Sequence, residues 1–227
     1  MSSLLGPEPN APVTYRKGSV GFGVAAVEMN LGLAVTGTFD AVVDAAVRKY
    51  QTRHGLAVDG DVGPITQRSM AAQFMGSARN KYGLPVNMLA SIVKLESGFY
   101  VAATNFRISG YVDVGWVQMH VPFPSLTHDY VADCYGPNCF GYTASILRNR
   151  FDAYMGYGKV DARRGWELAV LAHNWPYGAF QLVRGIPLST EPANWVINIG
   201  VPGIDTPAEW AEYYIDRATS MMDWKDV

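Results

Sequence analysis

Apolar side chains recur at helical spacing in several stretches of the chain. Between residues 39 and 50, one such face is formed by Phe39, Val43, Ala46, Val47 and Tyr50. A spacing of three or four residues places side chains on the same side of a helix. Gly55 follows as a natural stop, because glycine readily adopts the left-handed conformation that ends many helices. The stretch therefore predicts an amphipathic helix.

A second apolar face leads into the stretch SIVKLESGF, residues 91 to 99. Leu89, Ile92 and Val93 precede Glu96 by seven, four and three positions, so the glutamate continues an apolar face. A carboxylate is costly to bury there without a partner or a role. If the helix end opens onto a cleft, desolvation disfavours the charged form, which suits a general acid. The alternative is a glutamate that caps nearby backbone or pairs with an arginine.

Polar residues mark the expected starts of three further helices. Asn87 precedes the helix that carries Glu96, and Asp161 precedes RRGWELAVLAH. Thr206 precedes PAEWAEYYIDRATSMM, where Pro207 stands at the first helical position and Glu209 completes a capping box. These signals predict a mainly α protein.

The first 75 residues contain an internal repeat. GLAVTGTFDAVVDAAV at 32–47 is echoed by GLAVDGDVGPITQRSM at 55–70. From KGSVG to this second copy, the sequence resembles the peptidoglycan-binding repeat domain, a small three-helix module of cell-wall enzymes. The resemblance implies binding of a glycan strand or a stem peptide. Thr36 and Asp40 depart from the aspartate and glycine that are common in the family's first turn.

The predicted organisation is a flexible leader at 1–13, a peptidoglycan-binding domain at 14–75 and a second, mostly helical domain at 76–227. With 49% hydrophobic and 17% charged residues, the chain is globular. Its net charge of −2 argues against nucleic acid as a partner. No signal peptide and no apolar run of membrane-spanning length is recognised, so we expect a monomer that is made in the cytoplasm without membrane insertion.

Candidate metal and thiol chemistry is sparse. The four histidines form no metal-binding motif, so the sequence predicts neither a metal nor another cofactor. Cys134 and Cys139 are separated by a short stretch that contains Gly136 and Pro137. A disulfide and two separate thiols are both compatible with this spacing.

Three motifs follow one another within residues 78–185: ESGF at 96–99, ISGYVDVGWVQM at 108–119 and AHNWPYG at 172–178. Their order resembles the catalytic domain of soluble-type lytic transglycosylases, which share the lysozyme-like fold with goose-type lysozyme. The resemblance implies that residues 76–227 form a lysozyme-like catalytic domain. It also implies that Glu96 is the catalytic acid and that Ser109 corresponds to a serine of the family's site.

Further residues are carried over from the same motifs. Gly115–Gln118 matches the family's G-L-M-Q motif, which implies that Gln118 contacts substrate. Residues 172–174 match an A-Y-N segment, in which His173 replaces tyrosine and Asn174 offers an amide to sugar acetamide groups. His173 could hold Glu96 ionised or share its proton, or it could be a plain core or surface histidine. Gln118 and Asn174 could instead tie parts of the domain together.

Aromatic residues within the motifs suit sugar binding, because sugar faces stack on aromatic rings. The candidates are Tyr111, Trp116, Trp175 and Tyr177. Trp175, next to Pro176, is expected to be an exposed platform. Core packing is the alternative for each ring.

The resemblance implies cleavage of the β-1,4 bond between N-acetylmuramic acid and N-acetylglucosamine. In a lytic transglycosylase, Glu96 would act first as acid and then as base, and the product would carry a 1,6-anhydro ring. A hydrolysing muramidase usually requires a second carboxylate. Asp113 is the candidate for that role, and the alternative for it is an ordinary turn aspartate in GYVDVG.

The layout as a whole resembles a bacteriophage endolysin, which accumulates in the host cytoplasm and reaches the wall through membrane holes made by another protein. A non-catalytic wall-binding protein and a virion-associated, wall-drilling enzyme are the alternatives. The host, the wall chemistry and the ligand of the small domain stay open at this point.

Overall fold

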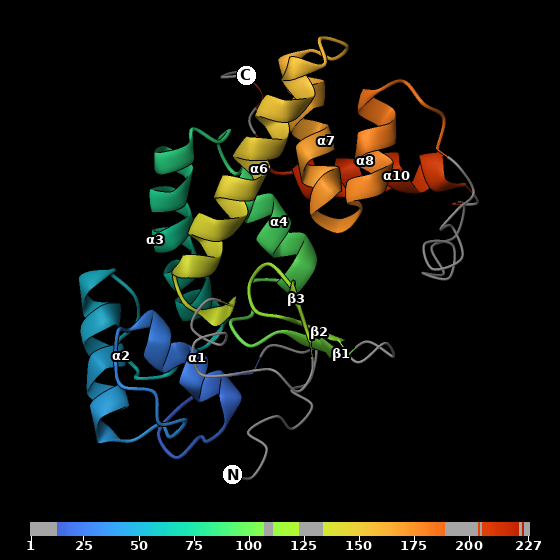
Figure 1. Ribbon diagram of the computed structural model, residues 1–227. Coiled ribbons are helices and arrows are strands. Elements are labelled where there is room, and N and C mark those ends of the chain that lie inside the picture. The colour runs from blue at the N-terminus through green and yellow to red at the C-terminus, as the bar shows by residue number, and fades with distance from the viewer. Residues whose placement is uncertain are drawn as a thin grey trace. The chain divides into compact units, whose positions relative to one another are not determined.

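The computed structural model describes residues 13–106, 111–122, 134–188, 204, 206–222 and 224. Within these residues the chain is mainly helical, which confirms the predicted fold class (Figure 1). The described helices are α1 (Phe22–Asn30), α2 (Ala41–Arg53), α3 (Pro64–Tyr82), α4 (Met88–Ser97), α6 (Asn138–Gly156), α7 (Ala162–Asn174), α8 (Pro176–Val183) and α10 (Pro207–Thr219). In the part of the chain that is described, no helix has the length and apolarity to cross a membrane.

The chain divides into two compact units, and each is built from two separate stretches. The first unit comprises residues 1–78 and 96–142, and the second comprises 79–95 and 143–227. The boundary predicted between residues 75 and 76 lies inside α3, which runs unbroken from Pro64 to Tyr82. Residues 71–82 contain no proline and a single glycine, Gly76, so nothing in that stretch interrupts helical hydrogen bonding.

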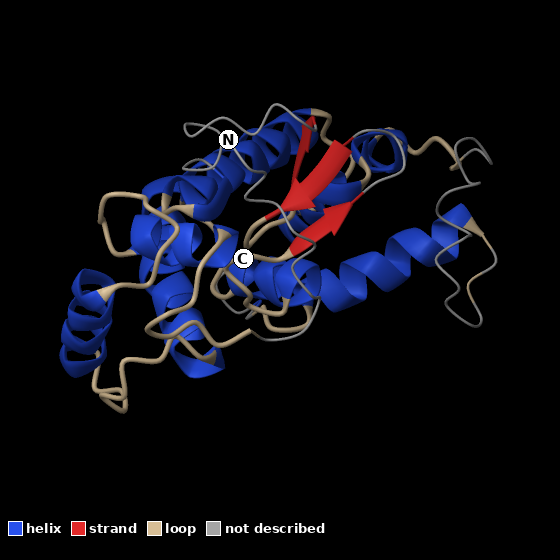
Figure 2. Ribbon diagram, turned by 90° about the horizontal axis from the view of Figure 1, so that it is seen from below, coloured by secondary structure: helices blue, strands red, loops and turns tan. Residues whose placement is uncertain are grey.

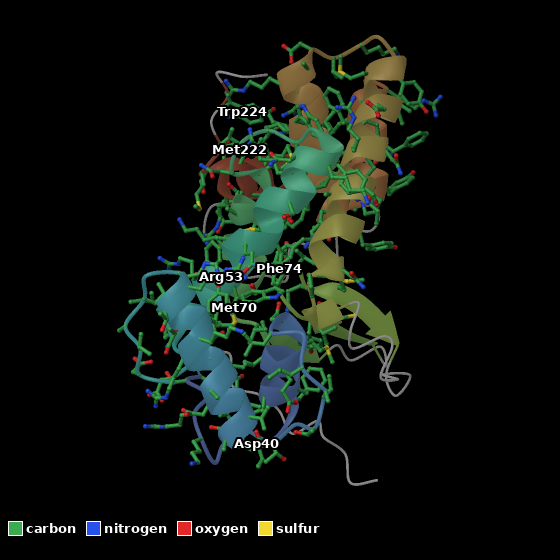
Figure 3. All side chains as sticks on the ribbon, turned by 90° about the vertical axis from the view of Figure 1, so that its left-hand side faces the viewer. Asp40, Arg53, Met70, Phe74, Met222 and Trp224 are labelled. Carbon is green, nitrogen blue, oxygen red and sulfur yellow. The ribbon has the colours of Figure 1, made fainter. Side chains whose placement is uncertain are left out.

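The three helices of the small module lie in the first unit, and α3 continues beyond it. The side chain of Asp40 caps α2 by accepting hydrogen bonds from the backbone N–H groups of Val42 and Val43 at 2.8 and 3.0 Å. Asp40 and Arg53 mark opposite ends of α2 (Figure 3). The apolar face predicted for this helix is confirmed: Phe39, Val43 and Val47 are buried, and Ala46 and Tyr50 are half-buried. The core of the module includes Val24, Val27, Phe39, Val43, Val47 and Met70.

A small sheet follows α4 in the first unit (Figure 2). It consists of β1 (Thr104–Phe106), β2 (Tyr111–Val114) and β3 (Met119–Pro122), antiparallel and in that order. The sequence motifs did not predict these strands, because each contains only three or four residues, too few for a clear alternating pattern. Cys134 and Cys139 also belong to this unit, and both are buried thiols rather than a disulfide.

In the second unit, α7 packs against both α8 and α10. Two of the three predicted N-caps are confirmed: Asp161 accepts a hydrogen bond from the backbone N–H of Arg164 at 2.8 Å, and Thr206 forms a capping box with Glu209. Asn87 directly precedes α4, as predicted, and its backbone is left-handed, with φ of 62°. Arg164 also joins α7 to α10 through a bidentate ion pair with Glu212. Both side chains of this pair are partly exposed, so we expect it to add little to the stability of the packing between α7 and α10.

Candidate functional site

Glu96 lies in the last turn of α4, as the sequence predicts. Leu89, Ile92 and Val93, on the preceding turns, are all buried, so the apolar face is confirmed. The side chain of Glu96 is itself half-buried. This residue is therefore partly shielded from water.

The chain turns sharply after Glu96. Gly98 and Phe99 both have left-handed backbones, with φ of 60° and 69°. This conformation is uncommon for phenylalanine and requires support from the surrounding structure. Part of that support comes from Phe99 itself, which is buried with the guanidinium of Arg68 5.2 Å from its ring centroid. The neighbouring Ser97 donates a hydrogen bond to the backbone carbonyl of Trp116 at 2.8 Å.

The turn between β2 and β3 carries the predicted glutamine motif. The side-chain NH₂ group of Gln118 donates to the backbone carbonyls of Ala103 and Gly115, at 3.2 and 3.1 Å. The backbone N–H of Gly115 also donates to the carbonyl of Ala103, at 2.8 Å. Both amide hydrogens of Gln118 are therefore engaged with main chain. A contact of Gln118 with a sugar would use its side-chain oxygen as acceptor.

Asp113 occupies a different position from the turn that the sequence allowed. It lies in the central strand β2, in register with Asn105 of β1 and His120 of β3, and its side chain is 5% exposed. The interpretation as an ordinary turn aspartate is therefore wrong. Gly115, two residues later, makes the turn that ends the strand. A carboxylate this deeply buried in a sheet needs polar partners, or a role.

The remaining candidates from the three motifs belong to different parts of the chain. His173 and Asn174 end α7 in the second unit, and both are half-buried. Ser109 falls outside the described residues. Tyr111 begins β2, and its side chain is not described.

The structure corrects the expectation for Trp175. Its side chain is 3% exposed and packs edge-on against Trp210, with ring centroids 6.0 Å apart, so it is not an exposed platform. It is buried because α10, which carries Trp210, packs against α7 at this point. The exposed rings nearby are those of Tyr177 and Phe180 on α8, which are 54% and 38% exposed.

The two repeated turns of the small module each close on a buried polar side chain. In the first turn, the carboxylate of Glu28 accepts hydrogen bonds from the backbone N–H groups of Thr36 and Gly37, eight and nine residues later. In the second, Gln51 stands at the corresponding distance from Asp59 and Gly60. Its oxygen accepts from the Gly60 N–H at 2.9 Å, and its NH₂ group donates to the Asp59 carboxylate at 2.6 Å. The repeat in the sequence is therefore a repeat of structure.

Gln67 is a buried structural residue that the sequence analysis missed. Its side chain is 1% exposed, and its NH₂ group donates to the backbone carbonyls of Val13 and Val62 at 2.8 and 3.1 Å. Its oxygen accepts from the backbone N–H of Val101 at 3.0 Å. Within the first unit, Gln67 therefore ties the small module to the loop that follows Glu96. The signal was a polar residue three and four positions before the buried Met70 and Ala71, the same kind of signal as that of Glu96.

Comparison with known families identifies the small module. Residues 25–70 match the family model described as "Putative peptidoglycan binding domain". No curated protein matches the chain at a significant level. The chain therefore carries a peptidoglycan-binding domain, which makes peptidoglycan its ligand.

Proposed function

We propose that the chain is a peptidoglycan-degrading glycosidase in which Glu96 is the catalytic residue and residues 25–70 hold the enzyme on the wall. The observation that carries the proposal is the setting of Glu96. A half-buried carboxyl stands at the end of an apolar helical face, next to a left-handed turn whose backbone is held by buried contacts. Such a carboxyl is both positioned and partly desolvated, as general acid–base catalysis requires.

The reaction that we propose is lytic transglycosylation. The Glu96 carboxylic acid gives its proton to the glycosidic oxygen between N-acetylmuramic acid and N-acetylglucosamine, and the bond from C1 to that oxygen breaks. The acetamido group of the muramic residue stabilises the positive charge at C1. The Glu96 carboxylate then removes the proton of the C6 hydroxyl, whose oxygen bonds to C1. The carboxyl is thereby regenerated in its protonated form, and no water is consumed.

A hydrolytic reaction is the second candidate, with Asp113 as its second carboxylate. A retaining or inverting muramidase uses two carboxylates across the scissile bond. Asp113 is a buried carboxylate in the central strand of the sheet that follows the Glu96 turn. In this reaction the oxygen of a water molecule would bond to C1 as a hydroxyl group, and the product would carry a reducing muramic acid end.

The binding domain suits either reaction. Tethering an enzyme to its polymer raises the local substrate concentration, so that even a weak glycosidase becomes effective. We further propose that the protein is a phage endolysin that acts from the host cytoplasm once the membrane has been opened. Its accumulation late in infection, rather than in purified virions, would separate this role from that of a wall-drilling virion enzyme.

The test is digestion of purified peptidoglycan, followed by mass spectrometry of the soluble fragments. We expect 1,6-anhydromuramic ends from the wild type and none from Glu96→Gln. Glu212→Gln is the matched control, because it changes the same chemical group at an exposed site on α10. Reducing ends would instead identify a hydrolase. If Glu96→Gln released as much product as the wild type, the proposed role of Glu96 would be wrong.

A further inference from the structure

The second repeated turn of the binding module borders an open pocket of about 430 Å³. All but one of its lining residues belong to the stretch from Gly55 to Thr66, and Thr14 completes the wall. This stretch lies within residues 25–70, the part of the chain that matches the peptidoglycan-binding family. The pocket is therefore a cavity in a domain whose ligand is peptidoglycan.

The lining combines two carboxylates with an apolar wall. Asp59 and Asp61 supply the charges, and Leu56 and Ile65 supply apolar surface. Ile65 is 75% exposed, so its side chain is available for contact with a ligand. Hydrogen bonds from the backbone N–H of Asp61 and from the side chain of Gln51 hold the pKa of Asp59 below its usual value. Asp59 is therefore ionised throughout the neutral range.

The guanidinium of Arg48, on α2, is already engaged with other groups. It pairs with Asp44 at 3.0 Å and donates to the backbone carbonyls of Val58 and Asp59 at 3.1 and 2.9 Å. These contacts hold the turn in place from behind. Arg48 also interacts electrostatically with Asp59 and Asp61, so one guanidinium is shared among three carboxylates and these four groups together keep a net negative charge.

The first repeated turn closes without carboxylates at the two corresponding positions. Thr36 and Thr38 stand there in the places of Asp59 and Asp61. The carboxylate of that turn belongs to Glu28, which is 1% exposed and engaged with backbone N–H groups. In the second turn the buried position is a neutral glutamine, and the carboxylates stand at the pocket instead. The second turn thus keeps its internal hydrogen bonds and also carries carboxylates that line the pocket.

We propose that this pocket binds the free ammonium group of a diamino-acid residue in the stem peptide of peptidoglycan. The carboxylates of Asp59 and Asp61 accept hydrogen bonds from the ammonium group, and the alkyl chain that carries it lies against Leu56 and Ile65. An ammonium group offers three donors, and each pairs with a carboxylate more strongly than a neutral glycan hydroxyl or acetamide group does. This inference rests on peptidoglycan binding by the module, and it names the part of the polymer that is recognised.

The experiment measures depletion of the full chain from suspensions of purified peptidoglycan. All proteins carry Glu96→Gln, so that the wall is not digested during the measurement. Asp61→Asn is the test variant. Asp40→Asn is the control, because it removes the same charge in the first repeat, and asparagine caps a helix about as well as aspartate does. As a second, independent measurement, the free amines of the peptidoglycan are acetylated.

We expect Asp61→Asn to weaken binding about tenfold, the order expected when a charge-assisted contact becomes neutral. The protein that keeps Asp61 should bind acetylated peptidoglycan about tenfold more weakly than untreated peptidoglycan. Acetylation should weaken binding of Asp61→Asn little further, because both changes remove the same interaction. Glycan strands stripped of their peptides should bind the two proteins equally. If instead the stripped strands still distinguish the two proteins, the ligand is an ammonium group on the sugar, and the assignment to the stem peptide is wrong.

Other outcomes separate this inference from the proposed function. Unchanged binding after both changes, with firm attachment to the wall, would overturn the pocket assignment and leave peptidoglycan binding intact. If Asp61→Asn and Asp40→Asn weakened binding to peptidoglycan equally, the effect would come from the overall charge of the protein. That result would also overturn the pocket assignment. If the protein carrying only Glu96→Gln does not bind untreated peptidoglycan, the proposed wall attachment fails, and the pocket assignment fails with it.

Discussion

Replacement of Gly115 by alanine tests how tightly the turn between β2 and β3 is held. Gly115 has φ of 77°, a left-handed conformation that costs an alanine about 1–2 kcal/mol. A Cβ atom at this position would also overlap the backbone carbonyl oxygen of Cys134. Because the backbone sets the position of Cβ and the oxygen belongs to the main chain, no change of side-chain rotamer relieves the overlap. Overpacking of this kind costs about 1–3 kcal/mol, so the total expected loss of stability is about 2–5 kcal/mol.

The matched control is Gly32→Ala in the same unit. Gly32 has φ of 68°, and no atom of the described residues comes within 4 Å of a Cβ placed there. Its substitution carries only the backbone cost, about 1–2 kcal/mol. Urea denaturation followed by circular dichroism would give both losses. Hydrogen exchange should also show faster exchange across 111–122 in Gly115→Ala only. Equal losses for the two variants would refute the close approach of Gly115 to Cys134.

Three further predictions follow from the polar contacts of the first unit. Gln67→Met removes the partners of one backbone N–H and two carbonyls, and we expect a loss of about 2–4 kcal/mol in urea denaturation, with faster hydrogen exchange at Val101. Glu28→Gln keeps an acceptor for Thr36 and Gly37 and should cost about 1 kcal/mol, whereas Glu28→Met should cost about 2–4 kcal/mol; a similar loss in both variants would contradict this assignment. The lowered pKa of Asp59 means that its contribution to stability is present above the usual carboxyl pKa, near pH 4, and is lost as the pH falls through the lower folded-state value. The stability difference between the wild type and Asp59→Asn, measured from pH 7 to pH 2, should therefore shrink only at the acid end.

The sequence predicted those features that depend on neighbours along the chain. The helix starts at Asp161 and Thr206 rest on contacts within three residues. The residues that form each repeated turn lie within a few positions of one another, so the repeat in the sequence reveals both turns. Glu96 was recognisable for the same reason, since its apolar neighbours lie on its own helix.

Features that depend on distant partners were not predicted. Trp175 is buried because Trp210, from a helix later in the chain, packs on it, and no local pattern contains that contact. The hydrogen bond of Gln67 to Val101 joins residues 34 positions apart. The strand position of Asp113 depends on pairing with two other short strands. In each case, the decisive contact is made only when remote segments come together.

The continuity of α3 has a consequence for dissecting the protein into parts. A shortened chain that ends near residue 75 would cut α3 after its third turn and remove residues 96–142, the other half of the first compact unit. The amide oxygen of Gln67 would lose Val101, and the ring of Phe74 would lose Phe140. Residues 25–70, which match the family model, therefore do not form a separable folding unit in this chain. A graft that is to keep the wall-binding fold of this chain must bring the Glu96 turn and the small sheet with it.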